Sequence, residues 1–253
     1  MKSNRLTRRA LLCAIALVPA LAQALPPDTT EPMGQSFATP KPAKTLRVAI
    51  VGSGSSHDFP KYFLGTDSET LKAAGDIDVA ATPNLEEALK LMKDADVLVF
   101  SGNHDQYGSE EFQKALNKFA DSGKGLVFVH AATWAHNWKG YNDRFIGGRT
   151  PSHGYGEFEV TVENKKNAIT KDVPETFKIT DENYRFELNK RAKVDVCCEN
   201  APDNTKDPIP SVWIVKDRKA KIVCITLGHA EEAHNNPAYK TLLTNSVKWV
   251  GGM

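Results

Sequence analysis

Short apolar runs alternate with amphipathic stretches through the first half of the chain. Apolar runs typical of strands covered on both faces lie at residues 45–52, 77–82, 96–100 and 125–132. Between them, apolar residues recur at spacings of three and four, which predicts helices over residues 67–74, 84–92 and 109–123. Strands that alternate with helices predict an α/β fold, in which a mainly parallel sheet lies between two helical layers.

The pattern changes in the second half, where strand-like segments follow one another with few helices. Strands are predicted at residues 157–162, 193–198, 211–215 and 220–226. The turn at residues 217–219 favours antiparallel pairing of the last two strands. Pro237 is typical of the start of a helix, which we expect to be the last one. No linker interrupts residues 45–253, so we predict that they form one α/β domain.

The N-terminal segment is predicted to direct export. Residues 1–24 contain four basic and no acidic residues, an apolar run over residues 10–22, and the small-x-small site Ala22-Gln23-Ala24. Residues 7–12 resemble a twin-arginine signal, although ordinary secretory signals also contain paired arginines. The alternative is an uncleaved anchor, but the apolar run is too short to span a bilayer comfortably. Residues 25–44 contain five prolines and are predicted to be a linker.

Removal of this signal changes the charge of the protein. The full chain of 253 residues has a formal charge of +1, whereas the part after residue 24 has 28 basic and 31 acidic residues and a charge of −3. Nucleic-acid-binding proteins usually carry a basic patch, so we expect no nucleic-acid partner. We also expect a periplasmic or extracellular protein with no stable membrane insertion after signal cleavage. The sequence leaves a homo-oligomer open.

Three cysteines remain after signal cleavage. An oxidising compartment allows one disulfide, between Cys224 and either Cys197 or Cys198, because adjacent strand residues point to opposite faces. Small buried thiols are the commoner structural role. The spacing of the three cysteines is not that of a zinc motif.

Several catalytic motifs fail in this sequence. The segment Gly52-Ser53-Gly54-Ser55-Ser56-His57 starts like a dinucleotide fingerprint but has His57 in place of the third glycine. No G-x-S-x-G segment occurs, which disfavours a serine hydrolase. His229 and His234 are five residues apart, roughly 140° around a helix, which is the wrong spacing for a zinc protease. We therefore expect His234 to be a surface loop residue.

Histidines gather where the predicted strands end. His57, His130 and His229 each follow a strand, and His153 follows a glycine turn. Ligands of parallel α/β sheets bind beyond the carboxyl ends of the strands, so these side chains are candidates for one site. Any one of them alone is more often a hydrogen-bonded core or loop residue. Further candidates at this edge are Asp58, His104, Trp134, Asp181, Glu182 and Tyr184.

Two of these candidates also have ordinary structural interpretations. The trio Asp181-Glu182-x-Tyr184 is also consistent with a solvated loop in which the aspartate caps a helix. Trp134 and Trp138 are placed to stack on a sugar ring, but at a spacing of four on a helix they are more often core residues.

Short motifs in a fixed order make residues 45–251 resemble the trehalose-utilisation (ThuA-like) family. The resemblance rests on Gly52–Phe59, Gly125–Ala132, Gly147-Gly148, His153, Asp181–Tyr184, Leu227-Gly228-His229, Asn236–Tyr239 and Trp249. It implies a class I glutamine-amidotransferase-like, flavodoxin-like α/β fold and a link to trehalose or related glycosides. The amidotransferase relatives carry a cysteine nucleophile on the turn where this chain has His130. Thiol chemistry is therefore excluded at that position.

We expect an enzyme that acts on a sugar or glycoside, including a 3-keto form, with His130, Glu182 and His229 as catalytic residues. Substrate contacts are predicted for His57, Asp58, Trp134, His153 and Tyr184. A histidine base suits proton abstraction beside a ketone, whereas ordinary glycosidases need two flanking carboxylates. The sequence leaves open whether a divalent metal such as zinc is a cofactor; the candidate ligands are His57, His130, His153 and His229. The alternatives are an exported carbohydrate-binding protein without catalysis and a purely structural histidine cluster.

Overall fold

The computed structural model describes residues 44–102, 105–134, 136–201 and 207–253. The predicted signal, the linker up to residue 43 and His104 lie outside these residues. A nine-stranded sheet has the order β2-β1-β3-β4-β11-β10-β9-β6-β7. Its strands are β1 (Leu46–Val51), β2 (Ile77–Thr82), β3 (Val97–Phe100), β4 (Gly125–Val129), β6 (His153–Val162), β7 (Thr176–Tyr184), β9 (Val194–Asn200), β10 (Ile209–Lys216) and β11 (Lys221–Ile225).

The first five strands in this order form the parallel half of the sheet. β1 pairs in parallel with β2 and β3, and β4 pairs in parallel with β3 and β11. The order β2-β1-β3-β4-β11 is that of a flavodoxin-like sheet, which confirms the α/β prediction. Parallel strands share one orientation, so β1, β3, β4 and β11 all end at the same edge of the sheet.

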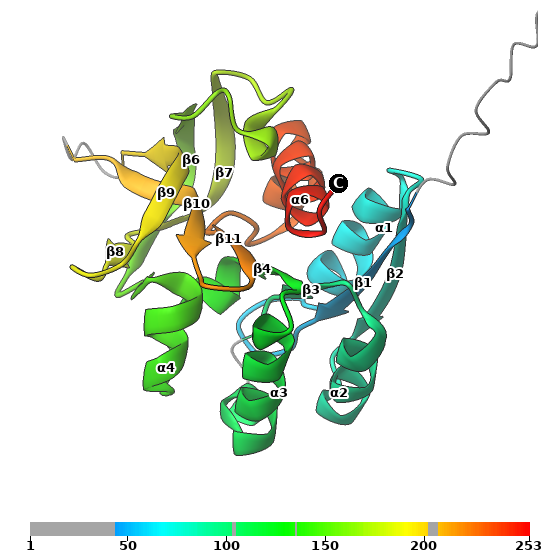
Figure 1. Ribbon diagram of the computed structural model, residues 1–253. Helices are drawn as coiled ribbons and strands as arrows, with labels where there is room; N and C mark the ends of the chain where they lie inside the picture. Colours follow the sequence, from blue (N-terminus) through cyan, green and yellow to red (C-terminus); the bar gives the residue numbers. More distant parts are fainter. Residues whose placement is uncertain (1–43, 103–104, 135, 202–206) are drawn as a thin grey trace, which may run out of the picture. The chain divides into compact units, whose positions relative to one another are not determined.

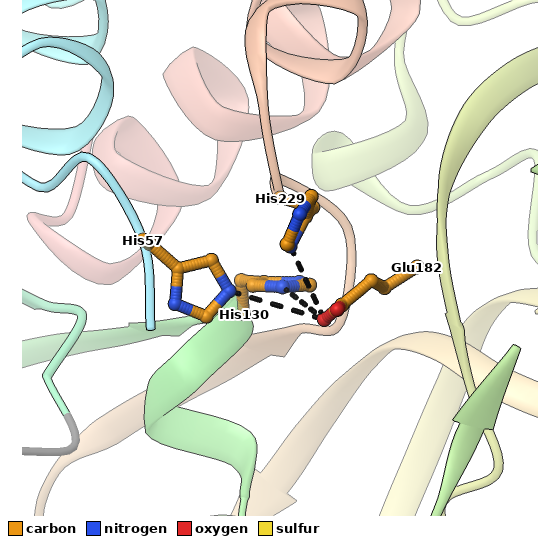
Figure 2. A group of neighbouring side chains, drawn as sticks. All are labelled: His57, His130, Glu182 and His229. Carbon is orange, nitrogen blue, oxygen red and sulfur yellow. Dashed lines mark hydrogen bonds and ion pairs between the residues drawn. The ribbon is translucent and has the colours of Figure 1, made fainter. Parts of the chain in front are cut away.

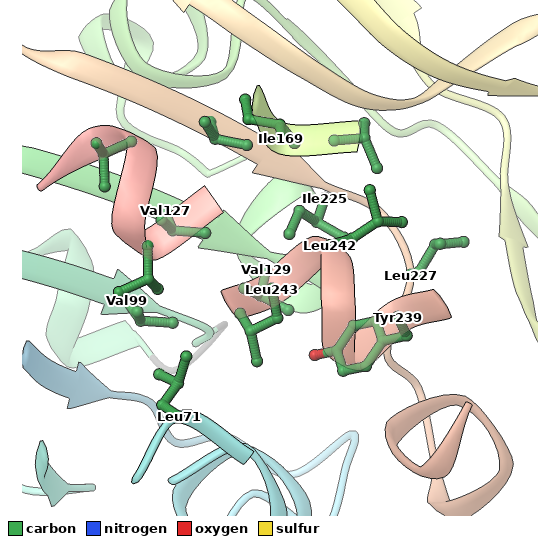
Figure 3. Packing of buried hydrophobic residues seen from close by; sticks show 14 of the residues in the cluster. Leu71, Val99, Val127, Val129, Ile169, Ile225, Leu227, Tyr239, Leu242 and Leu243 are labelled. Atoms are coloured by element: carbon green, nitrogen blue, oxygen red, sulfur yellow. The ribbon is translucent and has the colours of Figure 1, made fainter. Parts of the chain in front are cut away.

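Helices cover both faces of the parallel half (Figure 1). The helices are α1 (Asp67–Lys72), α2 (Leu85–Asp94), α3 (Glu110–Asp121), α4 (Lys139–Tyr141), α5 (Glu231–Asn235) and α6 (Pro237–Val250). One buried cluster joins the sheet to α1 and α6 (Figure 3), and a second joins it to α2 and α3. Side-chain caps start three helices where the sequence offers them, at Asn84, Ser109 and Asn236.

The other half of the sheet is antiparallel. β11, β10, β9, β6 and β7 pair successively in antiparallel fashion, and the predicted turn at residues 217–219 connects β10 to β11. β6 pairs with β9 only at residues 160–162, whereas it pairs with β7 over residues 153–161. Residues 153–159 of β6 and 178–184 of β7 therefore form a two-stranded ribbon beyond the main sheet. A small second sheet pairs β5 (Gly148–Arg149) with β8 (Glu187–Leu188).

One predicted strand is shorter than its apolar run suggested. The run over residues 125–132 gives a strand only as far as Val129, and η3 (His130–Thr133) is a 3-10 turn. The chain bends because His130 has a φ of 43°, in the left-handed region that side chains seldom adopt. Such strain is typical of functional turns.

The cysteines are free thiols. Cys197, Cys198 and Cys224 are all buried and unpaired. Their expected role as small buried core residues is confirmed, and the alternative of a disulfide is wrong. Burial raises the pKa of each thiol, that of Cys197 to about 12. No helix in the described part of the chain is both long and apolar enough to cross a membrane.

Candidate metal centre

Three strand ends of the parallel half and the ribbon bring four side chains together. His57 follows β1, His130 follows β4 and His229 follows β11, as predicted. Glu182 comes from β7, across the sheet. One ligand atom from each of the four lies within 4.8 Å of every other (Figure 2).

His130 is fully buried and its tautomer is fixed by its neighbour. Its Nδ1 lies 2.6 Å from the carbonyl oxygen of Thr226, which only accepts, so Nδ1 carries the proton. Burial lowers the pKa of His130 to about 3, although the contact with Glu182 opposes this. Burial therefore favours the neutral form of His130, in which Nε2 has a lone pair available to a metal ion.

Glu182 faces that lone pair with a carboxylate oxygen. Its Oε2 lies 3.2 Å from His130 Nε2. Burial raises the pKa of Glu182, but its contacts with His130, His229 and His57 outweigh this and hold the pKa far below its usual range. The carboxyl is therefore ionised. A contact this short between His130 Nε2 and the Glu182 carboxylate needs a proton or a shared cation between the two atoms.

His57 and His229 aim buried nitrogens at the same point. Nε2 of His57 lies 3.9 Å and Nδ1 of His229 lies 3.2 Å from Glu182 Oε2, and neither nitrogen makes a hydrogen bond. Phe59 and Phe63 contact the His57 ring edge to face, which limits its orientation. A buried polar atom without a partner is unusual and needs an explanation. A metal ion bound among these atoms supplies one.

Separations between the ligand atoms suit a divalent transition metal. Ligands at about 2.0–2.1 Å from a tetrahedral zinc ion lie about 3.4 Å apart. The contacts of Oε2 with the three histidines, at 3.2, 3.2 and 3.9 Å, bracket that value. Imidazole favours zinc, copper, iron or nickel over calcium or magnesium. The carbonyl oxygen of Thr226 accepts a hydrogen bond from His130 Nδ1 and so fixes the orientation of the ring. Metal-binding histidines commonly donate their second ring nitrogen to a backbone carbonyl in this way.

Gly52 lets the β1 loop approach the end of β3. A Cβ atom at this position would lie only 2.0 Å from the carbonyl oxygen of Ser101. The glycine that begins the failed dinucleotide fingerprint therefore serves close backbone packing. This packing holds the start of the loop that carries His57.

Asp181 ties Glu182 to His229 from outside the cluster. It is buried on β7, and its carboxylate accepts hydrogen bonds from the backbone amides of Glu182, Gly228 and His229 at 2.7–2.9 Å. Burial raises the pKa of Asp181 to about 6, although these three amides oppose the shift. The prediction of a solvated loop with a helix-capping aspartate is wrong, because Asp181 lies in a strand and binds the turn before α5.

Substitution of Asp181 by asparagine is expected to weaken metal binding about 10–100-fold while the chain stays folded. The amide group cannot accept from all three backbone amides, so Glu182 and His229 lose their common support. Zinc titration against a competing chelator measures the change. Asp195→Asn, on the exposed part of β9 beside Lys216, is the matched control. Equal affinities in D181N and the unmodified protein would show that the support is dispensable.

The ribbon places two other predicted residues, His153 and Tyr184, beside the centre. His153 lies opposite Tyr184, and Tyr155 lies opposite Glu182, so all four share one face. His153 Nδ1 is 3.3 Å from Glu182 Oε1, the oxygen that faces away from the other histidines. His153 is thus outside the set of four ligand atoms, and its side chain is 40% exposed to solvent.

Tyr184 and Trp134 form the wall behind His153. The Tyr184 ring lies 4.4 Å from that of His130 and 5.6 Å from Trp134. Tyr184 is buried, and burial raises the pKa of its phenol, so it supports His130 and has little surface for a substrate. Trp134 is half-buried and contacts His153 edge to face. Trp134 and Trp138 lie outside helices, so the prediction of a four-residue helical spacing is wrong.

Asp58 accepts a hydrogen bond from the backbone amide of Lys61 at 3.1 Å, and its contact with a substrate stays a prediction. One sequence prediction fails on local geometry. His234 is fully buried on α5 and hydrogen-bonded at both ring nitrogens, so the prediction of a surface loop residue is wrong. The rejection of a zinc-protease helix is confirmed, because His229 precedes α5 (Glu231–Asn235).

Tyr155 was not predicted. It is 61% exposed, and its ring lies 5.8 Å from that of His229. The sequence around it does indicate a strand with His153 and Tyr155 on one face, because these two residues alternate with glycines at a period of two. Only the pairing with β7 shows that this face meets the histidines.

The fold is of the class I glutamine-amidotransferase-like type, and the turn that follows its strand β4 carries His130. The family model for ThuA, described as trehalose utilisation, matches residues 49–250. The chain belongs to this family, which confirms the resemblance seen in the sequence.

Solved structures support the same fold. A ThuA-like protein from Parabacteroides merdae ATCC 43184 has a TM-score of 0.69 at 18% identity, over 82% of this chain and 90% of that one. A ThuA-like protein from Bacteroides uniformis ATCC 8492 has a TM-score of 0.66 at 20% identity, over 85% and 94%. The glutaminase domain of Trypanosoma brucei CTPS with bound acivicin has a TM-score of 0.51 at 15% identity, over 81% and 94%. No curated protein sequence matches the chain.

Proposed function

We propose that this ThuA-family protein binds one divalent transition metal at His57, His130, Glu182 and His229 and acts there on a sugar. The substrate we propose is trehalose or a related glycoside, including its 3-keto form. The observation that carries the metal is the convergence of one ligand atom from each of these four residues within 4.8 Å, where His57 Nε2 and His229 Nδ1 are buried without a hydrogen-bond partner. The family's link to trehalose utilisation supports the substrate class.

Each residue has a distinct part in this proposal. A bound divalent ion would polarise a substrate oxygen and lower the pKa of a hydroxyl group or water that it holds. Because His130 has no exposed surface, its part in this proposal is that of a ligand and not of a free base. His153 is oriented by Glu182 Oε1 and is accessible, so it takes or gives the proton on the substrate. In elimination from a 3-keto glycoside, His153 would take the proton from the carbon beside the ketone, the bond from the next carbon to the glycosidic oxygen would break, and the proton would pass to that departing oxygen.

Elemental analysis of protein purified without a metal-affinity tag tests the metal. We expect about one equivalent of a transition metal per chain. Assay of trehalose and 3-keto-trehalose then tests the reaction, with His153→Gln expected to lower kcat about 10²–10⁴-fold without loss of the metal. The absence of bound metal under saturating zinc would refute the centre. Full turnover by H153Q would remove His153 from the mechanism.

Tyr155 favours a second candidate function, an exported carbohydrate-binding protein without catalysis. An exposed aromatic ring beside His229 suits stacking on the apolar face of a sugar. Calorimetry with a panel of disaccharides separates the two functions. Tight binding without turnover, lost in Tyr155→Ala, supports the binding protein, whereas turnover supports the enzyme.

Export is part of the proposal, because residues 1–24 carry the features of a cleaved signal. N-terminal sequencing of the mature protein is expected to start at Leu25. A mature protein that keeps Met1 would contradict export by this signal.

A further inference from the structure

His234 lies beneath the turn that carries His229, in a cluster that the proposed chemistry does not use. Its side chain is fully buried, as are those of Asp67 on α1 and Tyr239 on α6. The His234 ring also stacks on Tyr62 at 5.4 Å and meets Phe63 edge to face at 4.7 Å. These contacts leave the imidazole one orientation.

Both ring nitrogens of His234 face acceptors. Nδ1 lies 2.7 Å from Asp67 Oδ1, and Nε2 lies 3.1 Å from the carbonyl oxygen of Gly228. A carbonyl oxygen cannot donate, so Nε2 carries a proton. Asp67 Oδ2 already accepts from the Tyr239 hydroxyl at 3.0 Å, as an ionised carboxylate does. One proton must therefore lie between Nδ1 and Asp67 Oδ1, and on Nδ1 it makes the ring an imidazolium.

A positive charge on His234 would compensate buried negative charge. Asp67 is its direct partner, and the charge of His234 also acts on Asp181, lowering the pKa of that carboxyl against the larger effect of burial. Burial of two carboxylates is costly unless they are paired and hydrogen-bonded. The imidazolium thus joins α1 to the turn between β11 and α5.

Gly228 forms hydrogen bonds through both its carbonyl and its amide group. Its carbonyl accepts from His234, and its amide donates to Asp181 at 2.7 Å. Its φ is 115°, and a Cβ atom would lie 3.1 Å from the Tyr239 hydroxyl, so a side chain at this position would be strained and crowded. The backbone of this turn is therefore restrained, and it determines where the side chain of the next residue, His229, points.

We propose that His234 is a positioning residue, a buried imidazolium held by Asp67 and Tyr239 that fixes the Gly228 carbonyl and so directs His229 toward Glu182. The effect of His234 on metal binding rests on the proposed metal centre. The charge state of His234 and its hydrogen bond to the Gly228 carbonyl do not depend on a metal.

Nitrogen NMR of the full-length, metal-free protein tests the charge state. The His234 ring signals, identified by their loss in His234→Gln, are expected to show both nitrogens protonated at pH 7. A neutral tautomer, with the proton on Asp67 instead, would overturn the proposal. This measurement needs no metal, so it separates the proposal from the fate of the metal centre.

Hydrogen exchange and Co²⁺ binding test the positioning. H234Q is expected to speed exchange of the Gly228 and His229 amides at least about tenfold and to weaken Co²⁺ binding about 10–100-fold, with altered visible bands of the bound ion. The double variant D67N/H234Q restores a neutral hydrogen-bonded pair and is expected to recover part of both losses. Glu231→Gln, an exposed change on the same helix, is the control.

The outcomes are distinct. Unchanged exchange at Gly228 and His229 in folded H234Q would overturn the positioning role, whatever the metal does. Faster exchange with no Co²⁺ bound by the unmodified protein would keep the positioning role and refute the proposed metal centre. A lower melting temperature without either change would leave His234 as a stabilising residue only and would also overturn the proposal.

Discussion

Substitution of Glu182 by glutamine is expected to lower zinc affinity by at least about 100-fold. Loss of outer-shell partners alone costs 10–100-fold, and Glu182 is the anionic member of the proposed ligand set itself. The substitution keeps the shape of the side chain while removing its charge. Competition titration with a chromogenic chelator measures the affinity.

The same variant separates a metal ligand from a structural ion pair. In the metal-free protein, the side-chain amide that replaces the Glu182 carboxylate can donate to the unprotonated Nε2 of His130, so E182Q is expected to be at least as stable as the unmodified chain. If Glu182 instead stabilised a charged His130, the variant would melt lower. Glu187→Gln, an exposed change near the same ribbon, is the control and is expected to alter neither quantity. Metal binding that survives E182Q would refute the ligand set.

Substitution of Trp213 by alanine is expected to cost about 3–5 kcal/mol in the free energy of unfolding. Trp213 is fully buried on β10, donates from Nε1 to the carbonyl of Ile146 at 3.0 Å, and packs 4.3 Å from the Phe186 ring. The variant loses this packing and leaves a cavity and an unpaired carbonyl. At about 2–4 °C per kcal/mol, the melting temperature is expected to fall by roughly 6–20 °C.

Trp213→Phe is the matched control for this prediction. It keeps a ring against Phe186 but loses the hydrogen bond to Ile146, so a smaller loss is expected. Calorimetry gives both values, and metal content per folded chain is expected to stay unchanged in each variant. A drop below about 1 kcal/mol for W213A would mean that the surrounding core collapses into the space.

The parallel half of the fold was predictable because its signals are local. Each apolar run from residue 45 to 129 specifies a strand, and the carboxyl ends of parallel strands must share an edge. His57, His130 and His229 were therefore predictable as neighbours, although far apart in sequence. The left-handed turn at His130 was not, since the apolar pattern continues through Ala131 and Ala132.

The ribbon was harder to predict because its contacts are not local. Glu182 and Asp181 share a strand but point to opposite faces, one toward the histidines and one toward the Gly228 turn. Only the pairing of β6 with β7 decides which face is which, and no sequence periodicity specifies that register. His234 was misjudged for a similar reason, because its partner Asp67 lies 167 residues away.

The ribbon that carries Glu182 attaches to the rest of the sheet through few backbone pairs, at residues 160–162. An ion shared by Glu182 and the three histidines would cross-link this ribbon to the parallel half. Binding and docking of the ribbon would then be one linked equilibrium, and metal at 100 times its Kd would add about 2.7 kcal/mol to stability. The concentration of metal would thereby affect not only the chemistry of the centre but also the fraction of molecules in which His153 and Tyr155 are held beside it.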